Sequence, residues 1–216
     1  KLIIEAAEGC TITLDGGADF TWNNYELAPG SNSRTLSEAI CNEGTLELKN
    51  VIIRNVNGSN PNGGAIIIDG SADGPTTLTN CKIENCYSQL GSAMIQGSKP
   101  VTIINSEINR CISGGGNVDN SGGAIRTYGS VSASLYLTGV KFTENYARRN
   151  VNYNNTLEKD GNGGALFWNA RGTNNTKCVI DGCEFAYNRS DDNGGAIKSQ
   201  ATIEFVNNTT EIHHNS

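Results

Sequence analysis

The feature of this chain that most restricts its fold is an internal repeat. A Gly-Gly-Ala-Ile or Gly-Gly-Ala-Leu motif begins at Gly63, Gly122, Gly163 and Gly194, and a Gly-Ser-Ala-Met variant begins at Gly91. The copies lie about 30 residues apart, and periods of this length are typical of stacked repeat architectures. One repeat cannot bury its apolar face alone, whereas neighbouring repeats that stack on one another can.

A second motif lies between the copies of the first. Its centre is an Ile or Phe, and another apolar residue usually precedes that centre by five positions. The central residues are Ile53, Ile83, Ile108, Phe142, Phe185 and Ile212, and the upstream residues are Leu48, Leu78, Ile103, Leu137 and Ile180. In the last copy the upstream position holds Asn207, which indicates a shift of a residue or two. We expect each set to stack as one ladder inside the molecule.

The segments that carry these motifs have the pattern of β-strands. They are short, alternate apolar with polar residues, and are punctuated by Gly and Asn, and no stretch has a useful helical period. We therefore predict one all-β domain, residues 1–216, built as a solenoid of parallel strands with about seven rungs and about three strands per repeat. Residues 1–45 are expected to supply the first rung, with Ile12 and Leu14 inside, and an N-terminal excursion. Residues 46–216 are expected to supply the repeats.

The turns of the repeat are expected to depend on Gly and Asn. The Gly pair suits a positive φ or a close backbone approach. Asn145, Asn188 and Asn215 share one turn position, where Asn tolerates the left-handed conformation and its amide can bond along the stack. The residue after the Gly-Gly-Ala-Ile motif varies widely and is expected to point outward. It is Ile67, Ile95, Arg126, Phe167 or Lys198.

The two motifs together resemble a known repeat. Gly-Gly-Ala-Ile/Leu combined with Phe-x-x-Asn, present here as Phe142–Asn145 and Phe185–Asn188, resembles the repeats of the chlamydial polymorphic outer membrane proteins and of related adhesin-like proteins. The resemblance covers residues 50–216. It implies a right-handed parallel β-helix in a surface-exposed or secreted protein, associated with the outer membrane if the source is bacterial. Its signature is structural and carries no catalytic residues.

The ends, charge and composition limit the partners. The chain starts at Lys1 without an initiator Met, so we expect a segment excised from a larger repeat protein, with flanking repeats of the same chain. The net charge of -6 would repel a phosphate backbone, so nucleic acid is not expected as a partner. No apolar run approaches the length of a membrane span, so no membrane insertion by this segment is expected.

The seven cysteines lack the spacing of zinc ligands. Cys81 and Cys183 fall at one repeat position, and Cys86 and Cys111 fall at another. Buried packing of small, weakly hydrophobic side chains is favoured over a disulfide framework, which a chain of this length does not need.

The sequence favours a protein that is not an enzyme and that needs no cofactor or metal. The carboxylate pairs that glycoside hydrolysis or a lyase would need do not recur in register on adjacent rungs. The candidates are Asp15/Asp19, Glu158/Asp160 and Asp191/Asp192, the last with Lys198 or Arg189. Neighbouring residues on a strand point to opposite faces, so His213 and His214 are not expected to bind one ion together.

A binding site is expected in the longest insertion, Tyr146–Asn162, because insertions in a solenoid lie on one face that often binds ligands. The candidate residues are Tyr146, Arg148, Arg149, Tyr153 and Trp168. An idle insertion remains an alternative, and so does simple core packing for Trp168. The excursion Phe20–Leu36, with Trp22 and Tyr25, is interpreted as a cap over the first rung.

Three functions are compatible with these features. The first is a non-enzymatic, adhesin-like surface or secreted module whose rod presents loops to a host protein or glycan. The second is a polysaccharide-binding or polysaccharide-cleaving β-helix. The third is a structural spacer.

Overall fold

The computed structural model describes residues 1–17, 20–21, 26–27, 38–58, 64–68, 72–88, 92–97, 99–114, 122–127, 133–148, 150–151, 157–158, 161–169 and 176–216. Within these ranges the protein is all-β. None of the described segments forms a helix that could cross a membrane.

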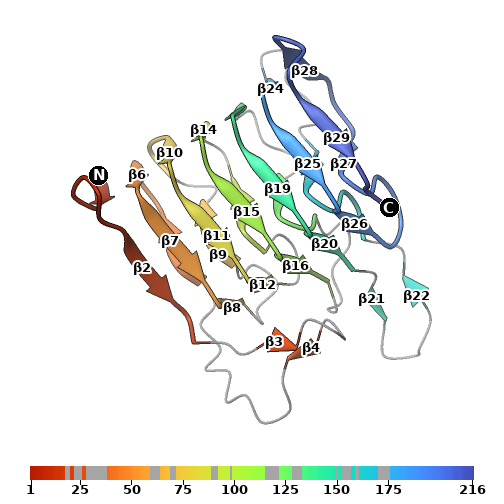
Figure 1. Ribbon diagram of the computed structural model, residues 1–216, viewed down its shortest axis with the longest axis horizontal. Coiled ribbons are helices and arrows are strands. Elements are labelled where there is room, and N and C mark those ends of the chain that lie inside the picture. The colour runs from red at the N-terminus through yellow and green to blue at the C-terminus, as the bar shows by residue number, and fades with distance from the viewer. Residues whose placement is uncertain are drawn as a thin grey trace.

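Four stacks of parallel strands make up the described body (Figure 1). Sheet I contains β1 (Leu2–Glu5), β6 (Leu46–Lys49), β10 (Thr76–Thr79), β14 (Val101–Ile104), β18 (Leu135–Thr138), β24 (Cys178–Asp181) and β28 (Ile203–Val206). Sheet II contains β2 (Ile12–Asp15), β7 (Val51–Arg54), β11 (Lys82–Glu84), β15 (Glu107–Asn109), β19 (Lys141–Thr143), β25 (Glu184–Ala186) and β29 (Glu211–His213). Sheet III contains β8 (Asn57–Gly58), β12 (Tyr87–Ser88), β16 (Ile112–Ser113), β20 (Tyr146–Ala147) and β26 (Arg189–Ser190). Sheet IV contains β5 (Glu38–Asn42), β9 (Gly64–Ile68), β13 (Met94–Gln96), β17 (Ile125–Thr127), β23 (Leu166–Trp168) and β27 (Ile197–Ser199).

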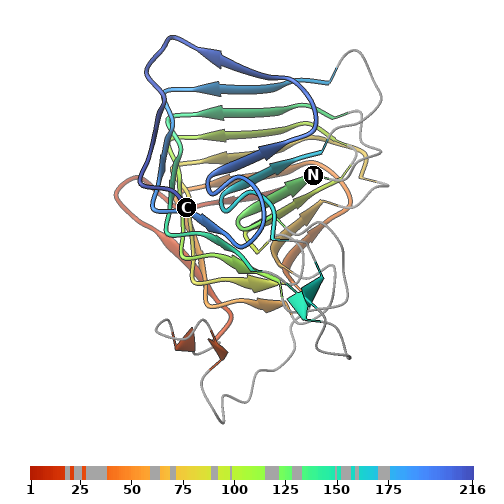
Figure 2. The same ribbon diagram turned by 90° about the vertical axis from the view of Figure 1, so that its right-hand side faces the viewer.

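The chain visits sheets I, II, III and IV in the same order in each complete repeat, so successive repeats lie on top of one another (Figure 2). This arrangement is consistent with a β-helix or solenoid. Two of the sheets have seven strands in the described residues, in agreement with the expected rung number. Each complete repeat supplies four strands rather than three, because the two-residue strands of sheet III follow the second motif directly.

The register of the sheets confirms both predicted ladders, but Ile212, on the last strand of sheet II, is 51% exposed and not inside the molecule as expected. In sheet II, Ile53, Ile83, Ile108, Phe142, Phe185 and Ile212 are partners in sequence, and Leu14 extends the ladder at the first rung. In sheet I, Leu48, Leu78, Ile103, Leu137 and Ile180 are partners. Phe205 pairs with Ile180, so the expected shift in the last copy is two residues.

The third inward ladder comes from the Gly-Gly-Ala motif in sheet IV. Its members are Ile40, Ile66, Met94, Ile125, Leu166 and Ile197. Phe167, at the position expected to point outward, is fully buried but does not join the continuous core cluster. The second Gly of each pair allows close stacking, since a Cβ on Gly123 would collide with the carbonyl oxygen of Gly164.

The predicted Asn ladder is present, but its conformation differs from the prediction. The Asn145 amide donates to Asn188 Oδ1 at 2.9 Å, and the Asn188 amide donates to Asn215 Oδ1 at 2.9 Å. The left-handed residue is the one before each Asn, namely Glu144, Tyr187 or His214. The turn therefore places the left-handed residue at the surface and directs the side-chain amide of the following Asn along the stack.

Five cysteines contribute to the core as buried free thiols: Cys81, Cys86, Cys111, Cys178 and Cys183. Burial raises the pKa of Cys178 to about 12 and raises that of Cys111 well above its ordinary value. The thiols of Cys111 and Cys178 therefore stay protonated near neutral pH, and all five buried cysteines act as packing groups, as the repeat positions predicted.

Candidate functional site

The longest insertion begins where β20 ends, and three of the five predicted binding residues are described. These are Tyr146, Arg148 and Trp168. Arg149 and Tyr153 lie outside the described residues. Within the insertion, β21 (Asn150–Val151) pairs antiparallel with β22 (Leu157–Glu158). This pair lies outside the stacked sheets, as does the antiparallel pair of β3 (Phe20–Thr21) and β4 (Glu26–Leu27) (Figures 1 and 2).

Tyr146 is the centre of a compact polar cluster on sheet III. The turn after Glu144 brings it into β20, where it pairs with Ile112 on one side and Arg189 on the other. Its hydroxyl donates a hydrogen bond to Asp191 Oδ2 at 2.6 Å. The Arg189 guanidinium lies 4.8 Å from the centre of the Tyr146 ring and is 3.2 Å from Asp191 Oδ1.

The electrostatics of this cluster favour binding over acid–base chemistry. Burial, followed by the hydrogen bond and the charge of Asp191, raises the pKa of Tyr146 to about 12. The phenol therefore stays protonated near neutral pH and serves as a donor. The Arg189 side chain is 51% exposed, so its guanidinium is the part of the cluster that a ligand could reach.

Backbone hydrogen bonds fix the base of the insertion to the next repeat. The N–H of Asp191 donates to the Ala147 carbonyl, and the N–H of Asp192 donates to the Gly161 carbonyl, each at 3.0 Å. Asn162 forms a parallel bridge with Asn193. Both ends of the insertion are therefore held beside the Tyr146 cluster.

Arg148 marks the point where the insertion leaves the stack. Its side chain is half-buried, and its N–H donates to the Ser113 carbonyl at 2.7 Å. Gly114, at φ 119°, lies so close that an added Cβ would meet the Arg148 carbonyl oxygen. The backbone of Arg148 is thus anchored to the preceding repeat.

Trp168 does not belong to this surface cluster. It lies on β23, is fully buried and is part of the continuous core. Of the two interpretations that the sequence left open, the structure places its side chain in core packing.

Two acidic candidates of the enzyme hypothesis, Asp15 and Asp191, are already engaged by neighbouring side chains. Hydrogen bonds from the Gly17 N–H, then from the side chains of Asn55 and Arg54, lower the pKa of Asp15 below its ordinary value. Asp191 is bound by Tyr146 and Arg189. Asp19 and Asp160 lie outside the described residues. The Asp15 carboxylate, which these hydrogen bonds favour in its ionised form, is not suited to act as a general acid.

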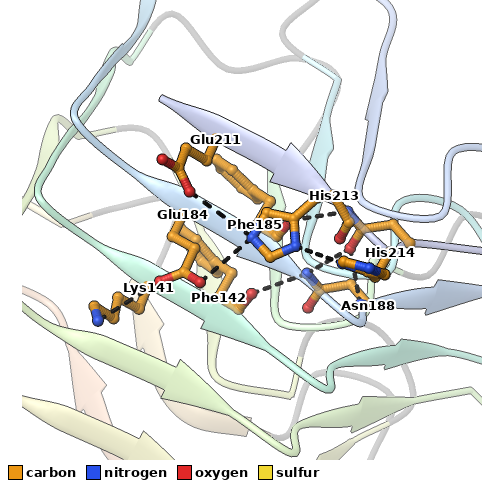
Figure 3. A network of polar contacts seen from close by, with 9 residues as sticks. Lys141, Phe142, Glu184, Phe185, Asn188, Glu211, His213 and His214 are labelled. Atoms are coloured by element: carbon orange, nitrogen blue, oxygen red, sulfur yellow. Dashed lines mark hydrogen bonds and ion pairs between the residues drawn. The ribbon is translucent and has the colours of Figure 1, made fainter. Parts of the chain in front are cut away.

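The expectation that His213 and His214 lie on opposite faces is wrong. His213 ends β29, but His214 has a φ of 54° and is outside the strand. The Nδ1 atoms of the two rings are 2.8 Å apart, and Figure 3 shows the rings together at the end of the stack. In the described residues, no group of three or more His, Cys, Asp and Glu side chains could hold a metal ion.

Apart from the Tyr146 cluster, a hollow in the surface lies at the turn between β1 and β2. It is open, has a volume of about 770 Å³, and is lined by Glu5, Ala6, Ala7, Glu8, Gly9, Lys49, Asn50 and Asn80. Lys49 Nζ contacts Glu5 Oε1 at 2.6 Å, so these two charges offset each other, and Glu8 adds a further carboxylate to the lining. This hollow has no counterpart among the sequence predictions, because it forms where two turns stack.

Comparisons with known protein families, with curated protein sequences and with solved structures found no match to this chain. The Tyr146 cluster is therefore assigned as the candidate site from its geometry alone. Sequence reasoning identified Tyr146 but missed its partners as binding groups. The signal that could have found them is the repeat register, which places Arg189 one repeat after Tyr146 at the same position.

Proposed function

We propose that this chain is a right-handed parallel β-helix of the polymorphic outer membrane protein repeat type. It serves as a non-enzymatic, adhesin-like module at the cell surface or in a secreted protein. The stacked repeats form a rigid rod, and the insertion after β20 is the part that contacts a host protein or glycan.

The ordered stack supports the fold part of this proposal. Parallel strands in one sheet are joined by connections that pass through the other three sheets. Connections between parallel strands of one sheet are right-handed in nearly all proteins. This preference, together with the resemblance of the two repeat motifs, favours a right-handed β-helix over a left-handed one.

The fixed base of the insertion is the observation that carries the binding part. A loop whose ends are bonded to the next repeat loses less conformational freedom on binding than a freely hanging one. Beside that base, the exposed Arg189 guanidinium lies over the Tyr146 ring and is oriented by Asp191.

The chemistry of the cluster suggests the kind of ligand. A planar guanidinium pairs well with carboxylate or sulfate groups, and Arg and Tyr are frequent in binding hot spots. Arg148 lies at the start of the same insertion, and Arg149 follows it in the sequence. An acidic glycan or an acidic patch on a host protein fits these guanidinium groups, although Asp191 and Asp192 offset part of their charge.

A binding array of glycans and matrix proteins tests the proposal. The native chain is compared with Arg189→Gln, which keeps a polar, hydrogen-bonding side chain but removes its charge. Arg110→Gln is the matched control, because Arg110 is also an exposed cation, paired with Glu144 on sheet II. We expect binding by the native chain, a weakening of about tenfold for Arg189→Gln, and no change for Arg110→Gln. Equal binding by all three would contradict the assigned site.

A further inference from the structure

The end of the stack brings the two histidines of the chain into one pair. Nδ1 of His213 and Nδ1 of His214 are 2.8 Å apart, and the ring planes are nearly perpendicular, at 88°. The left-handed conformation of His214 turns its ring toward His213 instead of to the opposite face. Two imidazole nitrogens at this separation share one proton, so at least one of them has a lone pair directed at the other.

Carboxylates on two neighbouring strands orient the ring of His213. Its Nε2 lies 3.5 Å from Glu184 Oε1 and 4.0 Å from Glu211 Oε2 (Figure 3). Nε2 thus lies on the side of the carboxylates, and Nδ1 lies on the side of the ring that faces His214. A histidine that binds a metal through one ring nitrogen often has a carboxylate next to its other ring nitrogen.

The ring of His214 is also held in place. It stacks on the ring of Tyr187, with centroids 5.0 Å apart and planes 16° apart. The backbone of the pair is fixed by Asn215, whose amide donates to the His213 and Phe185 carbonyls, each at 2.8 Å. Both imidazoles are thus positioned before any ligand arrives.

We propose that Nδ1 of His213 and Nδ1 of His214 form a two-nitrogen site for a divalent transition-metal ion, with water completing the coordination. The ion replaces the proton shared by the two nitrogens. Small turns of each ring about its Cβ–Cγ bond, which is a soft torsion, direct both lone pairs at the ion while the nitrogens stay about 2.8 Å apart. Glu184 and Glu211 add negative charge near the site, although Lys141, 3.6 Å from Glu184, offsets part of it. This site is separate from the proposed function and does not depend on it.

The spacing of the two nitrogens favours Ni²⁺ or Cu²⁺ over Zn²⁺. Nitrogens that are each about 2.05 Å from an ion and 2.8 Å from each other subtend an angle of about 86° at the ion. That angle is close to the right angle between neighbouring ligands in octahedral or square-planar coordination, which these two ions adopt. Tetrahedral zinc requires a wider angle and therefore a larger separation.

Titration calorimetry with Ni²⁺ tests the site on the untagged chain. A Cys10→Ser/Cys41→Ser background removes the two exposed cysteines, which would otherwise compete for the metal. We expect one Ni²⁺ per chain, weaker Zn²⁺ binding, and a loss of about tenfold or more in Ni²⁺ affinity for either His213→Ala or His214→Asn. Asn is chosen at position 214 because it tolerates the positive φ there.

Two further measurements keep the test decisive. Circular dichroism establishes that each variant keeps the native strand content. Electron paramagnetic resonance of the Cu²⁺-loaded chain, which needs no variant, is expected to show coupling to two imidazole nitrogens. Absence of Ni²⁺ binding by the native chain, unchanged affinity in both the His213→Ala and the His214→Asn variants, or a signal from one nitrogen only would overturn the proposal.

Discussion

The ring of Phe142 lies flat against the ring of Phe185, with centroids 4.8 Å apart and planes inclined by 7°. Both side chains are fully buried and occupy the same position in successive repeats of sheet II. They are the largest members of a ladder that otherwise contains Leu14, Ile53, Ile83, Ile108 and Ile212. The contact between these two rings therefore joins the two largest side chains of the sheet II ladder.

Replacing Phe185 by Ala should strongly weaken the stack. Loss of a fully buried aromatic side chain removes its contacts with both neighbouring repeats and leaves a cavity, so we expect a cost of about 3–5 kcal/mol. Urea unfolding followed by circular dichroism measures the effect. Phe205→Ala is the control, because Phe205 is 46% exposed at the last strand of sheet I and should cost about 1 kcal/mol or less. Equal losses for the two variants would contradict the ladder.

The buried amide of Asn188 makes a second, polar contribution to the same stack. It accepts from the N–H and the amide of Asn145 and donates to the Phe142 carbonyl. Asn188→Ala leaves these buried groups without partners, so we expect a cost of about 1–3 kcal/mol in urea unfolding. Asn207→Gly, which removes an exposed amide bound to Asp181 and tolerates the φ of 60° there, should change stability by less than about 0.5 kcal/mol. A larger effect at Asn207 than at Asn188 would be inconsistent with the amide ladder.

Asp15 should give the first rung a small dependence on pH. Folding lowers its pKa, so the ionised carboxylate stabilises the native state above its unfolded pKa of about 3.9. This contribution is lost as the pH falls through the lower folded-state pKa. We expect Asp15→Asn to cost less than about 1 kcal/mol near neutral pH, because the ion pair with Arg54 is exposed. Below about pH 4 the difference in urea midpoint between the native protein and Asp15→Asn should shrink. A difference that grew there would show that folding does not lower the pKa of Asp15.

The cysteines should divide into two classes of reactivity. Cys10 and Cys41 are exposed, whereas the other five lie in the core and burial raises the pKa of several of them. Because the thiolate is the reactive form, a thiol reagent near neutral pH should modify the two exposed cysteines first and the others only after unfolding. Mass spectrometry of short labelling times identifies the modified sites. Rapid modification of Cys111 in the native protein would contradict the buried assignment.

The periodic part of the fold follows from the sequence because the repeat sets the register. Once Ile53, Ile83 and Ile108 occupy equal positions in the repeat, stacking of the repeats makes them neighbours. The same logic found the ladder through Leu48 and the Asn amides. The repeat also showed that the register shifts in the last copy, but the size of that shift follows only from the pairing of Phe205 with Ile180.

The parts that the repeat does not define were predicted less well. The left-handed residue of the turn is one position earlier than expected, because the Asn amide must face the stack to bond its neighbour. For the same reason His214 leaves the strand alternation and meets His213. The contact of Tyr146 with Asp191 depends on a turn outside the strands, and no periodicity fixes where such a side chain points.

The most direct test of the account is binding by a variant in which residues 148–160 are replaced by a short Gly-Ser turn. The replacement removes the insertion but retains Tyr146, Arg189, Asp191 and the stacked sheets. Equilibrium binding to the ligands that the array identifies is measured for the native chain and for the variant, with equal urea stability as the control. The account predicts binding by the native chain and a weakening of at least about tenfold in the variant. No binding by either protein would contradict a recognition module and would favour a rod that serves as a spacer.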